Sequence, residues 1–155
     1  MQTADPALLK IIAEAIPDGI LVVGGGGRIV HVNEQVESLF GYTRDELVGR
    51  PVDILIPPHL RAAHAALQEA YFRHPLSRAM GTGLTLSARR KDGSEFPAEI
   101  SLSPALGPAD PLAIVVVRDV TGRRALEDDR RRAEERYRLF AEHAQDIVYH
   151  IRLVP

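Results

Sequence analysis

The first residues of the chain change from a helical to a strand-like pattern of apolar positions. Asp5 and Pro6 form a pair typical of a helix N-cap and first turn. They precede apolar residues at helical spacing, namely Leu8, Ile12 and Ala15. The β-branched runs 19–23 and 28–33 flank four glycines, so they predict a hairpin. We therefore expect a helix within residues 1–17, followed by two paired strands.

The pattern returns to a helical period from Glu34. A break at Gly41 and a capping residue at Thr43 indicate two short helices rather than one long helix. A further helix is predicted over residues 56–75. Its apolar stripe carries one imidazole, and the residues of this stripe are Leu60, His64, Leu67 and Tyr71.

The apolar runs that follow alternate as strands. The turn residues Lys91, Asp92 and Gly93 separate two of these runs and predict a second hairpin. One face of the second run is apolar and consists of Phe96, Ala98, Ile100 and Leu102. The run 112–120 is apolar on both faces, which is typical of a central strand. This order of elements predicts an α+β fold with an antiparallel sheet packed on helices along one face.

Residues 121–144 are rich in charge and free of proline, which predicts a long helix. Apolar residues repeat on it every seven positions, with one aromatic residue on the adjoining seam: Leu126, Ala133, Phe140 and Tyr137. Arg130 interrupts this stripe. A solvated helix packed on its own domain would explain the stripe, but its period favours a parallel dimeric coiled coil.

The composition fits one domain with an extension. Of the 155 residues, 45% are hydrophobic and 26% are charged, and the formal net charge of -2 does not favour nucleic-acid binding. The chain has no cysteine, which excludes disulfides, thiolate nucleophiles and flavins attached to a cysteine. It shows no signal peptide and no apolar run near the ~20 residues of a membrane helix, so we expect a soluble, cytoplasmic segment.

No residue pattern in the chain predicts an enzyme or a metal site. Asp45 and Glu46 are adjacent on a helix and point apart, and Ser101 has no evident base. The four glycines at 24–27 lack the lysine of a phosphate loop. His59 and His64 are five positions apart on a helix and face different directions, so they do not form a zinc pair.

Six motifs in order resemble the PAS sensor domain family, from about Pro6 to Arg124. They are "IPDGILVV", an asparagine at Asn33 opening a helix, "LFGYTRDELVGRPV", "IPPHLRAAH", "RRKDGSEFPAEISLSP" and "RDVTGRR". The resemblance implies a five-stranded antiparallel sheet curved around a small cavity, with helices as the other wall. Such domains usually sense and dimerise and seldom catalyse.

The family's geometry, combined with alternation and helical phase, implies a mostly apolar cavity. We expect it to be lined by Leu39, Phe40, Ile56, Leu60, His64, Leu67, Leu84, Leu86, Ile100, Leu102, Val115 and Val117. A fatty acid or a planar hydrophobe fits such a lining better than a dicarboxylate does. Asp119 and Thr121 resemble the Asp-x-Thr motif that ends many PAS domains. We expect them to bond backbone groups at the point where a signal would leave the domain.

His64 allows two interpretations. In heme-binding PAS oxygen sensors a histidine at the matching position of the pattern "IPPHLRAAH" holds the iron, so the resemblance implies a possible axial ligand. The arginine that several of those sensors use for bound oxygen is replaced here by Leu84, and Met80 lies two residues from Thr82, where a methionine ligand would fall. We therefore favour a packed or hydrogen-bonded histidine, with heme as the alternative.

The last residues repeat the opening pattern. The tail "YRLFAEHAQDIVYHIRLVP" resembles "LLKIIAEAIPDGILVV", with an apolar helix before a β-rich run. We expect a PAS domain at 18–120, a helical linker at 121–144 and the start of a second PAS-like unit at 145–155. The predicted function is a homodimeric sensory input module of a two-component or related receptor, whose output kinase or cyclic-dinucleotide enzyme lies outside this sequence. A ligand-free structural dimerisation domain is the other alternative.

Overall fold

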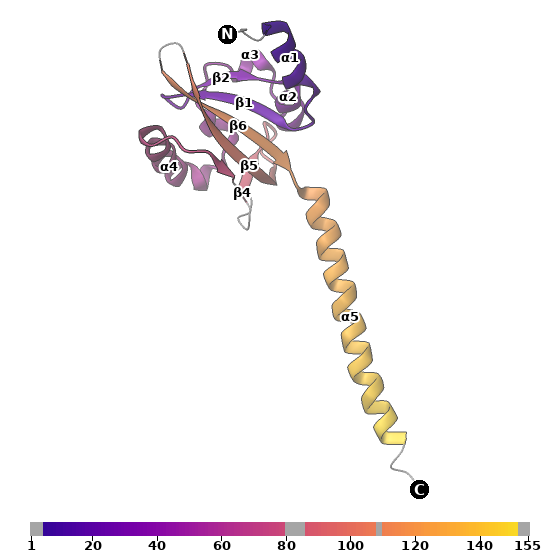
Figure 1. Cartoon of the computed structure of the whole chain (residues 1–155). Coiled ribbons are helices and arrows are strands. Elements are labelled where there is room, and N and C mark those ends of the chain that lie inside the picture. Colours follow the sequence, from indigo (N-terminus) through magenta and orange to yellow (C-terminus); the bar gives the residue numbers. More distant parts are fainter. Residues whose placement is uncertain (1–4, 80–85, 108–109, 152–155) are drawn as a thin grey trace. The chain divides into compact units, whose positions relative to one another are not determined.

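The computed structural model describes residues 5–79, 86–107 and 110–151 (Figure 1). The chain divides into two units, an α+β unit that ends at Val120 and a helical unit that begins at Thr121. Within the described residues, no helix combines the length and the apolar character that a membrane span requires.

An antiparallel sheet forms the frame of the first unit. Its strands are β1 (Gly19–Gly24), β2 (Ile29–Val32), β3 (Arg78–Ala79), β4 (Leu86–Arg89), β5 (Glu95–Leu106) and β6 (Pro111–Asp119). The order is β2-β1-β6-β5, and both β3 and β4 pair with the outer edge of β5, so the sheet has five strand positions. The sheet and its helices confirm the predicted α+β class and five-stranded antiparallel sheet.

The central position of β6 follows from its sequence. Val117 pairs with Gly19 of β1 on one side and with Ile100 of β5 on the other. A strand with neighbours on both sides and apolar side chains on both faces is stable only inside a sheet. Of the residues predicted to face the helices, Phe96 is buried, and Ile100 and Val115 are partly buried against the core.

The helices of the first unit are short, and each has a local reason for its ends. They are α1 (Pro6–Ala15), α2 (Glu34–Phe40), α3 (Arg44–Leu47) and α4 (Arg61–Arg73), with 3₁₀ turns η1 (Val52–Leu55) and η2 (Pro58–Leu60). Asp5 caps α1, Gly41 ends α2 in the left-handed conformation, and Thr43 and Glu46 form a capping box on α3. These ends agree with the sequence-based expectations.

The helix predicted over residues 56–75 begins later than expected. Pro57 and Pro58 lack backbone donors and restrict the residues before them, so the chain forms the 3₁₀ turn η2 before α4 begins at Arg61.

Asn33 connects the first helix, the first hairpin and α2. Its side chain has no exposed surface, and its Nδ2 donates to the carbonyls of Ala13 and Asp18, each at 3.0 Å. Its Oδ1 accepts from the backbone N–H groups of Ile20 at 2.9 Å and Val36 at 3.2 Å. One buried amide therefore satisfies four backbone groups from four segments.

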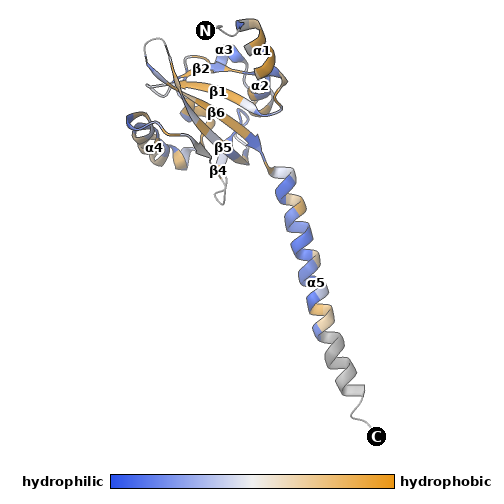
Figure 2. Ribbon diagram, in the orientation of Figure 1, coloured by the Kyte–Doolittle hydropathy of each residue, from blue (hydrophilic) through white to orange (hydrophobic). Residues whose placement is uncertain are grey.

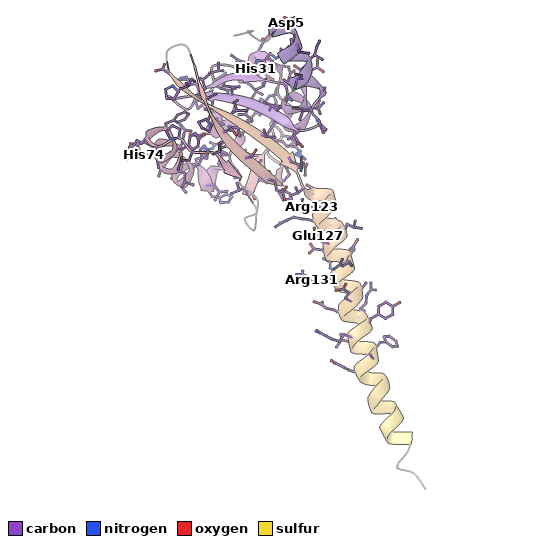
Figure 3. The ribbon with its side chains drawn as sticks, viewed as in Figure 1. Asp5, His31, His74, Arg123, Glu127 and Arg131 are labelled. Carbon is purple, nitrogen blue, oxygen red and sulfur yellow. The ribbon has the colours of Figure 1, made fainter. Side chains whose placement is uncertain are left out.

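The second unit is a single helix, α5 (Thr121–Ile151), of 31 residues. Figure 2 shows that hydrophilic residues predominate along the coloured part of this helix, with a few apolar positions among them. The predicted seam residues Leu126, Tyr137 and Phe140 are exposed in the single chain, and Ala133 is partly covered. Charged side chains line successive turns (Figure 3), and Arg123 Nε lies 3.6 Å from Glu127 Oε1.

The helix α5 continues beyond the predicted linker. Its backbone is helical through Ile151, whereas the linker was predicted to end at residue 144 and a second PAS-like unit to start at 145–155. A strand needs a neighbouring strand for its hydrogen bonds, whereas a helix satisfies them within the segment. The second PAS-like unit stays a prediction, and residues 152–155 lie outside the described structure.

Candidate ligand cavity

A cavity of about 270 Å³ lies between the sheet and the segment from η1 to α4. The strands contribute Leu21, Val23, Leu86, Ser87, Ala88, Ile100, Leu102, Ala113, Val115 and Val117. The helical side contributes Phe40, Val52, Leu55, Ile56, Leu60, Ala63, His64, Leu67, Gln68, Tyr71 and Phe72. The described lining residues include no Asp, Glu, Lys or Arg, so the interior is mainly apolar.

Most of the residues expected from the sequence meet at this cavity. Those that line it are Phe40, Ile56, Leu60, His64, Leu67, Leu86, Ile100, Leu102, Val115 and Val117. Leu39 does not line it, because consecutive helical residues point about 100° apart and Phe40 takes the inward position. Leu84, Thr82 and Met80 fall outside the described residues.

Several lining residues were missed by the sequence analysis. Tyr71 belonged to the stripe of α4 that was identified, and its place on that stripe was a sufficient signal. Ala113 lies on the same face of β6 as Val115 and Val117, and Leu21 lies on the same face of β1 as Val23. The two-residue period of a strand could therefore have indicated these residues. Gln68 had no such signal, because its polar side chain is typical of a solvated position.

His64 lies in the cavity wall with its ring held by a carboxylate. Its Nδ1 is 2.9 Å from Asp53 Oδ1 in η1, and the two side chains are 30% and 37% exposed. An ionised carboxylate can only accept a hydrogen bond, so Nδ1 carries the proton. In the neutral ring Nε2 then keeps its lone pair and can accept a hydrogen bond or ligate a metal.

The donor set fits heme in part. A carboxylate that holds Nδ1 is the usual means of orienting a ligating histidine, and the apolar lining suits a porphyrin. The volume of about 270 Å³ is slightly below the ~300–1,000 Å³ of most small-molecule sites, so a large planar ligand requires the cavity to widen. Among the described residues, no group of three or more His, Asp or Glu side chains could hold a metal ion.

A chain of contacts runs from the cavity towards the end of β6. The rings of Phe40 and Phe96 are 5.4 Å apart, and the Arg90 guanidinium lies 4.0 Å from the Phe96 ring centre. Arg90 Nη2 donates to Asp119 Oδ2 at 2.9 Å, and its Nη1 donates to the Leu39 carbonyl at 3.4 Å. The Asp119 carboxylate therefore forms an ion pair with Arg90. The sequence analysis expected Asp119 to bond backbone groups and did not predict this ion pair.

The family of the chain is decided by a sequence comparison. The model of the family described as "PAS domain" matches residues 17–122. The chain belongs to the PAS domain family. This result confirms the resemblance that the motifs had indicated.

Three relatives of this PAS domain are named as sensor proteins. It is 31% identical over 113 residues to the sensor protein FixL of Bradyrhizobium diazoefficiens, covering 73% of this chain and 22% of that protein. It is 29% identical to the oxygen sensor protein DosP of Escherichia coli K12, covering 73% of this chain and 14% of DosP. The sensory histidine kinase/phosphatase NtrB of Azospirillum brasilense is 30% identical, with 69% and 26% covered. The chain thus spans about a quarter or less of these relatives.

Solved structures show the same fold. The PAS domain of a Colwellia psychrerythraea protein superposes with a TM-score of 0.64 at 22% identity, covering 76% of this chain and 99% of that domain. The PAS domain of an HTR-like protein from Haloarcula marismortui gives a TM-score of 0.62 at 24% identity, covering 73% and 89%. At this identity the similarity concerns the fold alone.

Proposed function

We propose that this PAS domain is the sensory input module of a signal-transduction protein and binds a small, mainly apolar ligand. The observation that carries the proposal is the cavity between the sheet and α4, with its apolar lining. An apolar molecule gains free energy by leaving water for such a site, whereas a dicarboxylate loses hydration without finding a cation among the described lining residues.

The ligand signal leaves through the end of β6 and the start of α5. Asp119 and Thr121 flank this junction, and Arg90 connects Asp119 to Phe96 next to the cavity wall. A ligand that displaces Phe40 changes the packing of Phe96 and hence the position of Arg90. The output domain lies outside this sequence, in keeping with relatives that are several times longer than the chain.

The domain acts as a homodimer through the seam on α5. Leu126, Tyr137 and Phe140 are exposed in the single chain, and apolar side chains at this spacing bury one another in a parallel pair of helices. Replacement of Leu126 and Phe140 by glutamate should convert the dimer to a monomer in sedimentation. A wild-type chain that sediments as a monomer at high concentration contradicts dimerisation through this seam.

The ligand proposal is tested by mass spectrometry of the denatured, freshly purified chain, which should release a small hydrophobic molecule. Ala113→Leu fills the cavity, because Ala113 lines it, and should abolish the co-purified ligand. Ala62→Leu is the matched control, because Ala62 is an exposed residue of α4 that is not among the described lining residues. Absence of any ligand, with unchanged dimerisation in Ala113→Leu, would support a ligand-free structural dimerisation domain instead.

A heme-based gas or redox sensor is the second candidate. It is favoured by the contact between His64 Nδ1 and Asp53, and by similarity to a relative named as an oxygen sensor. If heme binds, it supplies an iron that His64 Nε2 would ligate, while Asp53 orients the ring. The apolar-ligand proposal predicts colourless protein after expression with a heme precursor. A Soret band that is lost in His64→Ala and kept in His59→Ala would establish the heme function.

A further inference from the structure

Two polar side chains share the cavity-facing side of α4. His64 and Gln68 are four positions apart, so they lie one above the other on one helix face. Gln68 packs against the turn between β1 and β2, where Gly27 has a φ of 73°. A Cβ on Gly27 would collide with Gln68 Nε2 and its amide carbon, so the glycine makes room for this amide.

The amide of Gln68 has unused hydrogen-bonding capacity. The side chain is half-buried in the cavity wall, and no described residue exchanges a hydrogen bond with it. An amide provides both donors and an acceptor. His64 adds an acceptor one helical turn away, because its Nδ1 proton is held by Asp53 and its Nε2 keeps a lone pair.

We propose that the ligand is a neutral, mainly hydrophobic molecule with a hydroxyl group, which donates to His64 Nε2 and accepts from Gln68 Nε2. This inference rests on the proposed function of the cavity. A hydroxyl is the smallest group that can both donate and accept, so it matches the two side chains together. An ionised carboxylate is disfavoured because the described lining contains no cationic side chain that would replace its hydration.

A matched set of probes tests this assignment by calorimetry on the 155-residue chain. The probes are naphthalene, 2-naphthol, 2-methoxynaphthalene and 2-naphthoate. We expect 2-naphthol to bind about tenfold more tightly than naphthalene, which is the usual effect of one or two satisfied hydrogen bonds. The methyl ether keeps the acceptor but loses the donor, so its affinity should lie between these two, and 2-naphthoate should bind most weakly.

The variant Gln68→Leu should remove most of the preference for 2-naphthol while naphthalene still binds. The control Gln35→Leu changes a glutamine of α2 that is not among the described lining residues, and it should leave the series unchanged. Equal affinities of the wild-type chain for naphthalene and 2-naphthol, or tightest binding of 2-naphthoate, overturn the hydroxyl assignment but leave the ligand cavity intact. Failure of all four probes to bind overturns both the assignment and the proposed function.

Discussion

The N-terminal frame comprises α1, β1, β2, α2 and α3. Apart from α1, whose Leu8, Ile11 and Ile12 are exposed, its elements bury apolar side chains far more completely than α4 does. Residues with at most 1% exposure in the frame are Leu21, Ile29, Val32, Asn33, Val36, Phe40 and Leu47. In α4, Tyr71 is buried, but Leu67 is 61% exposed although it lines the cavity. Both regions carry apolar stripes, so the difference lies in what each stripe packs against.

Hydrogen bonds follow the same division. In the frame, Asn33 bonds four backbone groups, and Glu14 of α1 accepts from the backbone N–H of Glu34 at 2.8 Å and from Arg44 at 3.3 Å. The N-terminus of α4 has no side-chain cap. Elements with few buried contacts and weak capping open at low free energy. We therefore expect α4 to open more readily than the frame does.

The largest contrast is expected between two leucines. Leu47→Ala in the frame should lower the free energy of unfolding by about 2–5 kcal/mol, because it leaves a cavity at a fully buried site. Leu67→Ala on α4 should cost less than about 1 kcal/mol, because most of that side chain is already in water. Urea unfolding of both variants measures the difference. Equal losses would show that α4 is packed as firmly as the frame.

Asn33→Ala should have the next largest effect. The substitution removes the side-chain partner of two carbonyls and of the Ile20 N–H group, and it leaves the Val36 N–H group only its bond to the Asn33 carbonyl. We expect a loss of about 2–3 kcal/mol in unfolding free energy, and faster amide exchange at Ile20 and Val36. Gln68→Ala on α4 is the control and should change stability by less than about 0.5 kcal/mol. A loss in Asn33→Ala no larger than in this control would contradict the frame's dependence on one amide.

The frame was also the region that the sequence predicted best. Its signals are local: Asp5 with Pro6, Gly41, and Thr43 with Glu46 act within four residues of the helix ends that they determine. The PAS family and the fold class were also predicted correctly. Both depend on short motifs and on the period of apolar residues, which shows which face of each element is buried.

The cavity was predictable in its apolar part and not in its polar part. Alternation and helical phase indicate which apolar residues face inward, whereas Leu39 was assigned inward beside Phe40 against the helical period. The approach of Gln68 to Gly27 joins positions 41 apart in the chain. No local pattern contains such a contact, because it depends on where α4 lies over the hairpin turn.

Backbone strain gives a smaller test of the frame. Gly41 ends α2 with a φ of 78°, a conformation that disfavours a side chain. Gly41→Ala should cost about 1 kcal/mol in unfolding free energy, although a Cβ there would meet nothing nearer than Lys91 at 3.8 Å. Gly26→Ala in the hairpin turn is the control, because its φ is not positive and its Cβ would meet no atom within 4 Å. Thermal melts in which both variants lose equal stability would refute the conformational explanation.

The smallest expected effect concerns the ion pair that joins the frame to β6. Arg118 Nη2 donates to Asp18 Oδ2 at 2.7 Å, and this hydrogen bond, with the charge of Arg118, outweighs burial and lowers the pKa of Asp18 below its ordinary value of 3.8. The pair therefore stabilises the fold above that pH and loses its contribution as pH falls through the lowered pKa. Because Arg118 is 59% exposed, we expect Arg118→Gln to lower the free energy of unfolding only slightly near about pH 7. The deficit should close as the pH falls below that lowered pKa, where Asp18 is protonated in both proteins. Arg73→Gln, which removes an exposed pair with Glu69 on α4, should cost less at either pH. Urea midpoints of the wild-type chain and of Arg118→Gln, measured as the pH is lowered, give the stability deficit. A deficit that stays constant with pH would mean that Arg118 acts through packing rather than through the Asp18 carboxylate.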